Sequence, residues 1–292
     1  MELQLDQLST LAAVVDNGSF ENAARAMRIT PSAVSQRIKS LEQQLGRVLL
    51  QRSKPVRATE SGQVLVRLAR QFAVLEREAF EALGAGDGSG RTVVPLVVNA
   101  DSLATWILPA LARVPELSFE LHLEDQDHST VLLRKGTVMA AVTSEPEAVQ
   151  GCIVRPLGSM QYRAMASPAF AERWFPEGPT PEALAVAPMV VFDRKDELQD
   201  RYLRLRTRRQ LHPPRNYVPA STDFVEAVVL GLGWAALPGI QVEGRLAEGL
   251  LVELDPGHPV DVPLYWQQWA LESTMLADVA DTLSRAAAEL LR

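Results

Sequence analysis

The sequence contains 292 residues, of which 47% are hydrophobic and 22% charged, so it can bury ordinary cores and falls outside the disordered and fibrous classes. This length exceeds one compact unit and predicts two or three domains. The net charge of −7 argues, taken alone, against a nucleic-acid partner, because a polyanion prefers a basic surface.

Three closely spaced helices are predicted at the start of the chain. Apolar residues at helical spacing indicate a first helix over residues 3–15 and a second over residues 20–27. Thr30 followed by Pro31 is a strong start signal for a third helix that runs to residue 46. Two short helices and a turn before a third are the layout of a helix-turn-helix.

The third helix has one apolar and one polar face. Val34, Ile38 and Leu41 share the apolar face, while the polar face carries hydroxyls, a cation and Gln36, whose amide can pair with an adenine edge. A solvated amphipathic helix is the alternative. Residues 25–57 contain eight basic side chains against one acidic one, a net charge of +7, which favours DNA recognition. The residues expected to contact DNA here are Thr30, Pro31, Ser32, Ala33, Ser35, Gln36 and Lys39.

A wing is predicted after the third helix. Residues 47–52 and 56–58 are expected to form two short strands around the turn 53–55. The cations at its tip and edges are expected to contact backbone phosphates or the adjoining minor groove, which gives affinity with little sequence information. They are Arg52, Lys54 and Arg57. With the three helices, the wing completes a winged helix-turn-helix domain over residues 1–58.

A long helix from Thr59 to about residue 83 follows, and residues 59–90 are interpreted as a dimerising linker. Its apolar residues repeat at alternating spacings of three and four, the pattern of a coiled-coil seam. Packing against the chain's own domain is the alternative; the glycine-rich hinge at residues 84–90 favours a helix that stands apart and pairs with a second chain. The residues expected at the dimer contact are Leu65, Leu68, Phe72, Leu75 and Ala79.

Beyond residue 91, short strands alternate with helices, which predicts an α/β domain with a mainly parallel sheet. Pro95 lies inside the first strand and would be better tolerated at a sheet edge. The expected strands are residues 93–99, 119–123, 139–143, 162–166, 189–192, 234–237 and 262–269. The expected helices are residues 103–113, 129–135, 168–174, 198–206, 224–230 and 275–291.

The chain resembles the LysR-type transcriptional regulators along its whole length. Residues 18–27 (GSFENAARAM), 30–42 (TPSAVSQRIKSLE) and 58–62 (ATESG) look like the DNA-binding signature of that family, which is long and specific. Residues 99–106 (NADSLATW) and 263–269 (PLYWQQW) are similar to the branch of ArgP and LysG regulators, which sense basic amino acids and activate an exporter gene.

The resemblance implies a fold and a set of partners. Residues 91–292 would form two α/β subdomains like those of a periplasmic binding protein, the first over residues 91–161 with 268–292 and the second over 162–267. A small effector, lysine or arginine, would bind in the cleft between them. The implied partners are promoter or operator DNA in double-stranded form, RNA polymerase and further copies of the chain, in a dimer or a dimer of dimers.

Candidate effector residues follow from the rule that ligands of open α/β sheets bind beyond the carboxyl ends of strands. A basic amino acid needs donors for its carboxylate, which Ser102, Thr105 and the amides after them can supply, and acids for its two cations. The resemblance adds the helix that opens at residue 221. The full expected set is Asn99, Asp101, Ser102, Thr105, Asp125, His128, Thr143, Asp193 and Asp223.

A LysR-type regulator of a different metabolite is one alternative, and two further functions differ in class. An enzyme is not expected, because the four histidines have no metal-ligand spacing, Cys152 has no nearby histidine and no phosphate-binding glycine loop is present; neither a metal nor a cofactor is therefore expected. An architectural DNA-binding protein without a metabolite is the second alternative, since the arginine-rich segment 201–215 offers a further DNA contact. It leaves about 200 residues of binding-protein fold without a purpose.

The location of the protein can also be predicted. The longest apolar stretches are well short of the roughly 20 residues that cross a bilayer. The N-terminus lacks an export signal, and the single cysteine, Cys152, can form no internal disulfide. A cytoplasmic protein without membrane contact is expected.

Overall fold

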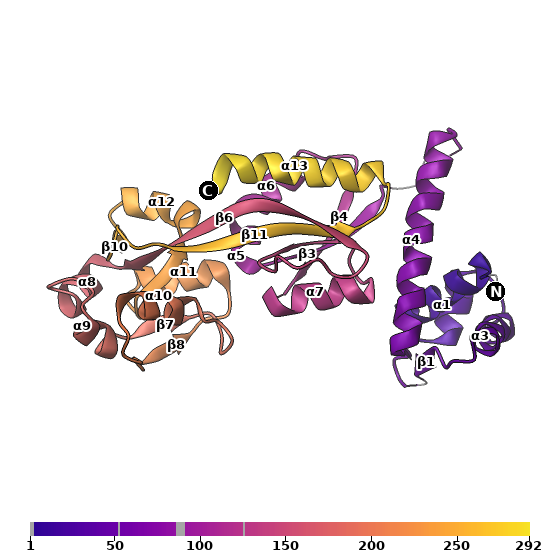
Figure 1. The fold of residues 1–292 in the computed structure, drawn as a ribbon, viewed down its shortest axis with the longest axis horizontal. Coiled ribbons are helices and arrows are strands. Elements are labelled where there is room, and N and C mark those ends of the chain that lie inside the picture. The colour runs from indigo at the N-terminus through magenta and orange to yellow at the C-terminus, as the bar shows by residue number, and fades with distance from the viewer. Residues whose placement is uncertain (1–2, 52, 86–90, 125) are drawn as a thin grey trace.

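The computed structural model describes residues 3–51, 53–85, 91–124 and 126–292. The molecule is elongated (Figure 1), with a helical head and a long helix at one end and an α/β region of two lobes at the other. In the described ranges, no helix combines the length and the apolar character needed to cross a membrane.

The head contains the three predicted helices, α1 (Leu5–Asn17), α2 (Phe20–Ala26) and α3 (Pro31–Leu45). The Thr30 side chain caps α3 by accepting a hydrogen bond from the Ala33 amide, and Gly46 ends the helix in the left-handed conformation. The apolar face of α3 is buried in the core of the head, as predicted: Val34, Ile38 and Leu41 are all at most 3% exposed.

The wing is shorter than the sequence indicates. Its strands are β1 (Leu50–Gln51) and β2 (Arg57–Ala58), paired antiparallel, so the prediction of a strand starting at residue 47 is wrong. The physical reason is a competing hydrogen bond: the Leu49 amide donates to the Glu42 carboxylate at 2.7 Å, which holds the start of this segment against α3.

Helix α4 (Glu60–Ala82) contacts the α/β region. The prediction that it stands apart from that region is therefore wrong. Val66 belongs to the core of the head, whereas Val74, two turns later, packs with Leu133 and Trp269 of the α/β region. The seam prediction considered one face of α4 alone. A second face, formed by Val66, Ala69 and Val74, is buried against the same chain.

The α/β region is built on one sheet of seven strands in the order β10-β6-β11-β5-β3-β4, with β9 also paired to β6. Only β3 with β4 and β3 with β5 pair parallel; the other pairs of this sheet are antiparallel, so the prediction of a mainly parallel sheet is wrong. The strands are β3 (Val93–Val98), β4 (Ser118–Leu123), β5 (Ala140–Thr143), β6 (Cys152–Ala166), β9 (Ala235–Pro238), β10 (Val252–Glu253) and β11 (Val260–Trp269).

Strand β3 lies between β4 and β5, so Pro95 is not at an edge. The Pro95 carbonyl accepts a hydrogen bond from the Met139 amide, one residue before β5 begins. In an extended strand the amide and carbonyl positions of one residue point to the same side. The missing donor of Pro95 therefore falls before the start of β5, where no ladder bond is lost.

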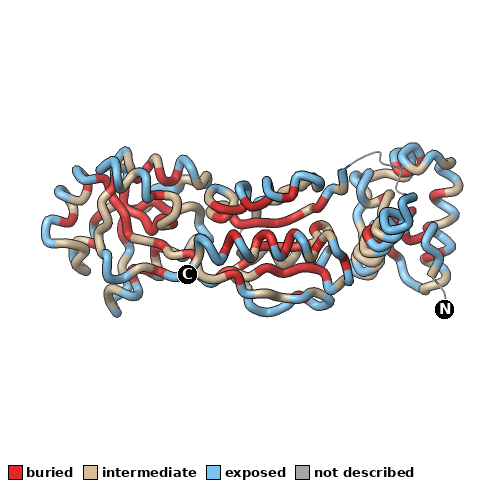
Figure 2. Tube along the Cα trace, turned by 90° about the horizontal axis from the view of Figure 1, so that it is seen from above, coloured by how far each residue is buried: buried red, intermediate tan, exposed pale blue. Residues whose placement is uncertain are grey.

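Helices cover both faces of the sheet in the first lobe, with α6 and α13 on one face and α7 on the other (Figure 1). Val94, Leu96 and Val98 pack on the α13 side and Val97 on the α7 side, which is the alternation expected of a strand buried on both faces. Figure 2 shows this core as buried strands under partly exposed helices. The helical elements are α5 (Ala100–Ser102), a π-helical turn (Leu103–Ile107), α6 (Leu108–Leu111), α7 (Gln126–Lys135) and α13 (Thr274–Leu290).

The second lobe has its own small core, which includes Phe224, Val228 and Leu237. Strands β6 and β11 run from one lobe into the other (Figure 1). This lobe holds β7 (Met189–Val191) and β8 (Arg215–Tyr217), which pair parallel, and the helices α8 (Pro168–Trp174), α9 (Pro181–Val186), α10 (Leu198–Arg206), α11 (Ser221–Val229) and α12 (Gly239–Ala247). The sequence patterns did not predict β8, β10, α9, α12 or the first two thirds of β6, residues 152–161.

Candidate functional site

Two surfaces of the molecule carry the functional residues predicted from the sequence. The first is the exposed face of α3. With the apolar face buried, the opposite face is free of the rest of the chain and lies at the outer surface of the head. It presents the exposed side chains of Thr30, Pro31, Ser32, Ser35, Gln36 and Lys39, while Ala33 is half-buried.

The wing adds cations beside this face. Lys54 and Arg57 are exposed, and Arg52 lies outside the described residues. Arg37, which contributes to the basic charge of the segment, points elsewhere: its guanidinium donates to the Asp6 carboxylate at 3.1 Å and to the Thr10 hydroxyl at 3.3 Å, tying α3 to α1. The positive charge available to an anionic partner is therefore smaller, by at least the charge of Arg37, than the net charge counted for residues 25–57.

The predicted dimer stripe on α4 is largely uncovered within one chain. Phe72 is 42% and Leu75 37% exposed, and Ala79 is also exposed. Leu65 and Leu68 are half-buried. The stripe therefore offers apolar surface that the chain itself does not cover.

The second surface is a cleft of about 630 Å³ between the two lobes. The first lobe contributes Asn99, which directly follows β3, and Asp101 in the short helix α5; the second contributes the segment after β7 and the first turns of α10. The position obeys the rule that ligands bind beyond the carboxyl ends of parallel strands. Charged groups on its walls are Asp101, Glu124, Asp193, Lys195, Asp196, Glu197, Arg201 and Arg204.

Asp101 connects the two lobes. Its carboxylate accepts a hydrogen bond from the Tyr162 hydroxyl at 2.7 Å and another from the Ser221 hydroxyl at 2.9 Å, at the start of α11. Burial raises the pKa of Asp101 above its ordinary value of 3.8, against the two hydrogen bonds, which lower it. The pKa of Tyr162 is raised by its own burial and by the Asp101 charge, so this hydroxyl stays neutral and donates.

Asp196 is the second acid with a perturbed pKa. Its carboxylate accepts from the Phe192 amide at 3.1 Å and the Leu198 amide at 2.9 Å, which fixes the loop ahead of α10. Burial raises its pKa, the two amides lower it, and the charges of Asp101 and Asp193 raise it further. The cleft therefore holds carboxylates that repel one another, an arrangement that a bound cation relieves.

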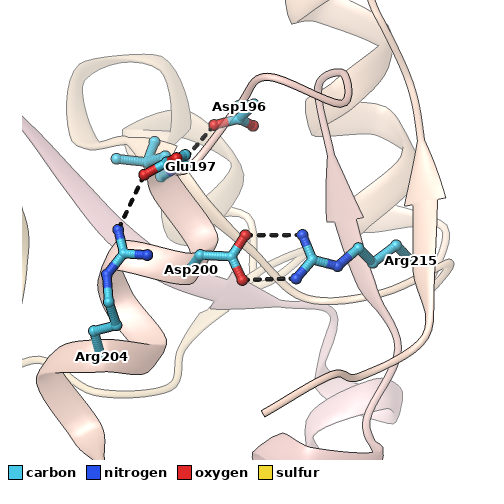
Figure 3. Close-up of polar contacts among 6 residues, drawn as sticks. Asp196, Glu197, Asp200, Arg204 and Arg215 are labelled. Carbon is cyan, nitrogen blue, oxygen red and sulfur yellow. Dashed lines mark hydrogen bonds and ion pairs between the residues drawn. The ribbon is translucent and has the colours of Figure 1, made fainter. Parts of the chain in front are cut away.

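The rest of this wall is held by ion pairs (Figure 3). Arg204 donates to Glu197 at 3.3 Å, and Arg215 holds Asp200 through two hydrogen bonds of 2.6 and 2.8 Å. The second pair is a two-pronged contact that joins α10 to β8. It fixes the helix whose first turn lines the cleft.

The structure brings three of the predicted effector residues to the cleft, Asn99, Asp101 and Asp193. Four others lie off its walls: Ser102 and Thr143 are buried, Thr105 donates to the Asp101 carbonyl, and Asp223 is exposed. Asp125 and the His128 side chain lie outside the described residues. The rule that ligands bind beyond the carboxyl ends of strands predicts neither the π-helical turn after Ser102 nor the short length of β5.

Sequence reasoning missed other residues of the cleft. Tyr162 lies inside a strand, and Glu197 and Gln199 lie at the start of a helix, positions that carry no signal for a ligand. Asp196 follows Asp193 by three residues in the same loop after β7. Extending the rule for ligands beyond strand ends to this whole loop would have included it. Among the described residues, no three potential metal ligands lie together.

Comparisons with known proteins fit both surfaces. Residues 5–63 match the model of the bacterial regulatory helix-turn-helix proteins of the lysR family, and residues 89–288 match that of the LysR substrate-binding domain. The chain belongs to the LysR family. It is accordingly a transcriptional regulator and not an enzyme.

Relatives place this LysR regulator more closely. It is 46% identical over 291 residues to the HTH-type transcriptional regulator LysG of Mycobacterium tuberculosis, covering 99% of this chain and 96% of the relative. It is 43% identical over 293 residues to the lysine export transcriptional regulatory protein LysG of Corynebacterium glutamicum, covering 98% of each. It is therefore a regulator of the LysG and ArgP kind.

Solved structures agree with that placement. The crystal structure of ArgP from Mycobacterium tuberculosis matches with a TM-score of 0.94 and 45% identity, covering 100% of this chain and 99% of that one. Full-length LysG from Corynebacterium glutamicum with bound effector Arg matches with a TM-score of 0.84 and 39% identity, covering 99% of this chain and 100% of that one.

Proposed function

We propose that this regulator binds L-lysine or L-arginine in the cleft and, in response, activates an amino-acid exporter gene. It binds promoter DNA through α3 and the wing. It forms a dimer or a dimer of dimers through the α4 stripe, and it interacts with RNA polymerase. Residues 1–58 form the DNA-binding domain, 59–90 the linker and 91–292 the effector-binding domain, whose subdomains are residues 91–161 with 268–292 and residues 162–267.

The observation that carries the proposal is the pair of partly buried carboxylates, Asp101 and Asp196, that line the same cleft; burial raises the pKa of each. A buried carboxylate with a raised pKa is one whose negative charge is poorly compensated in the free protein. A cationic ligand supplies that compensation, so the cleft favours a positively charged molecule. Among the described residues, the walls carry five acidic and three basic side chains, and one of the basic ones, Arg204, already pairs with Glu197.

The relatives support the same ligand class. LysG of Corynebacterium glutamicum holds arginine as its effector in a structure that is 39% identical, and the same relative is named for lysine export. The cleft volume of about 630 Å³ accommodates an amino acid of this size with solvent.

Calorimetry on the full chain tests the ligand. L-Lysine and L-arginine are expected to bind, whereas L-norleucine, which has the lysine chain without its ε-ammonium, is expected to bind at least about tenfold more weakly. Equal binding of norleucine, or no heat with either basic amino acid, would refute the assigned ligand class.

Footprinting on the promoter region of the exporter gene tests the response. We expect protection of a defined site whose pattern changes when the effector amino acid is added. An architectural protein would instead protect DNA broadly and show the same pattern with and without the amino acid.

A further inference from the structure

Gln199 is a buried glutamine that lines the cleft. It lies in the first turn of α10, and its side chain is only 1% exposed. Neither its amide oxygen nor its amide nitrogen has a hydrogen-bond partner among the described residues. Buried polar side chains are nearly always paired, so an amide that the protein leaves unpaired at a cleft-lining residue calls for a partner from outside the chain, which it can meet by a small side-chain rotation.

A second buried glutamine shows how this fold treats an amide with a structural role. Gln267 of β11 is 0% exposed, and its oxygen accepts from the Val149 amide at 3.1 Å. Its nitrogen donates to the carbonyls of Glu145 and Glu147, both at 2.9 Å. Gln267 is therefore satisfied by the backbone of its own lobe, whereas Gln199 is not.

Asn99 repeats the pattern on the opposite wall. It follows β3 in the first lobe, is 7% exposed, lines the same cleft, and its side-chain oxygen also lacks a partner among the described residues. The two lobes thus each bring a buried amide oxygen to one cleft, beside Asp101 and Asp196. The carboxylates attract a ligand by its positive charge. The neutral amides recognise the positions of its hydrogen-bond donors and acceptors.

These groups define what the ligand must offer. The oxygens of Asn99 and Gln199 need N–H donors, and the Gln199 nitrogen needs an acceptor. An α-amino acid has both, as ammonium and carboxylate, and a cationic side chain adds further N–H groups. We propose that Gln199 hydrogen-bonds the effector directly and is a specificity-determining residue of the cleft, an inference that rests on the proposed function.

The test is Gln199→Leu in the full chain, because leucine keeps much of the volume and removes the amide. Calorimetry with L-lysine and L-arginine is expected to show that affinity falls about tenfold or more for the amino acid that the wild-type chain binds more tightly. Without ligand, the melting temperature is expected to stay equal or rise, because no protein hydrogen bond is lost and an unpaired buried amide is removed.

Gln267→Leu is the matched control. It removes three hydrogen bonds inside the protein, so its melting temperature is expected to fall by several degrees while the folded protein keeps its affinity. Unchanged affinity of Gln199→Leu would overturn the inference, as would a loss of ligand-free stability like that of Gln267→Leu. Failure of the wild-type chain to bind either amino acid would instead overturn the proposed function.

Discussion

The Asp101 carboxylate bridges the lobes at an electrostatic cost, and Asp101→Asn separates its two effects. We expect affinity for the basic amino acid to fall at least about tenfold, because the variant loses a charge that the cation neutralises. The ligand-free variant is expected to be as stable as the wild type at pH 7 or more so, because an asparagine can keep contacts with Tyr162 and Ser221 without a buried charge. Calorimetry and thermal unfolding measure the two effects.

The pH dependence of stability checks the same residue. The folded-state pKa of Asp101 is raised above the ordinary value of 3.8, which describes the unfolded chain. Between the unfolded-state and the folded-state pKa, the folded state therefore binds more protons than the unfolded one. The contribution of Asp101 therefore makes the ligand-free wild type lose stability as the pH rises through that window. Urea unfolding at a series of pH values is expected to show a shallower fall in Asp101→Asn. Identical slopes in both proteins would contradict the raised pKa.

Gln36 and Lys54 are both exposed in the DNA-binding head but are expected to act differently. Gln36→Ala is expected to weaken binding by about 1–3 kcal/mol and to relax the preference for particular bases. Lys54→Ala is expected to weaken binding on all sequences and to reduce the salt slope by about 1. Gel retardation over a salt series, on operator and unrelated DNA, separates the two. A uniform loss for both variants would show that the recognition face is misassigned.

Helix α4 shows how far periodicity can be used to predict structure. The seam from Leu65 to Ala79 was found because heptad spacing is visible in the sequence, and the helix itself is confirmed. The contact with the α/β region was missed because Val74 lies off the seam, and because the contact also depends on polar side chains whose partners are backbone groups distant in sequence. Arg67 donates to the carbonyls of Gln150 and Gly151 at 2.8 and 2.9 Å, and no pattern along the chain encodes such partners.

The α4 stripe makes a prediction about assembly. Leu75→Asp is expected to shift the protein from dimer toward monomer, because it places a charge in the proposed apolar contact. Phe80→Asp, at a position that is 50% exposed on the same helix but off the stripe, serves as the control and is expected to leave the dimer intact. Sedimentation at several concentrations measures both. A dimer that survives Leu75→Asp would show that the chains associate elsewhere.

Glu78 on α4 ties the linker to the last helix of the chain. Its carboxylate accepts from the Ser273 hydroxyl at 2.6 Å and the Met275 amide at 3.2 Å, at the N-terminus of α13. An anionic acceptor there stabilises a helix, so Glu78→Ala is expected to cost about 1–2 kcal/mol. Urea unfolding measures the loss, with the exposed Glu76→Ala as the control. A loss no larger than that of the control would mean that the contact contributes nothing.

At the scale of the molecule, alternating strands and helices correctly indicated an α/β domain but not the direction of its strands. Parallel pairing is expected when each strand returns through a helix to the same end of one sheet. Here β6 and β11 run through both lobes and pair antiparallel over most of their length, with a bulge where Gly158 and Pro156 face Leu264 and Tyr265. Proline and glycine are typical of loops, so these residues prevented the prediction of the first two thirds of β6, residues 152–161.

The bond between Asp101 and Ser221 joins the first lobe to the second, so it offers a way to couple the cleft to the arrangement of the molecule. A ligand shifts a conformational equilibrium only through contacts that differ between the two states. Ser221→Ala removes a contact between the lobes and leaves the Asp101 charge in place. We therefore expect the amino acid to bind within about threefold of wild-type affinity, while its effect on the DNA footprint is lost. A variant that binds the amino acid and changes its footprint as the wild type does would show that the lobes are coupled through other contacts.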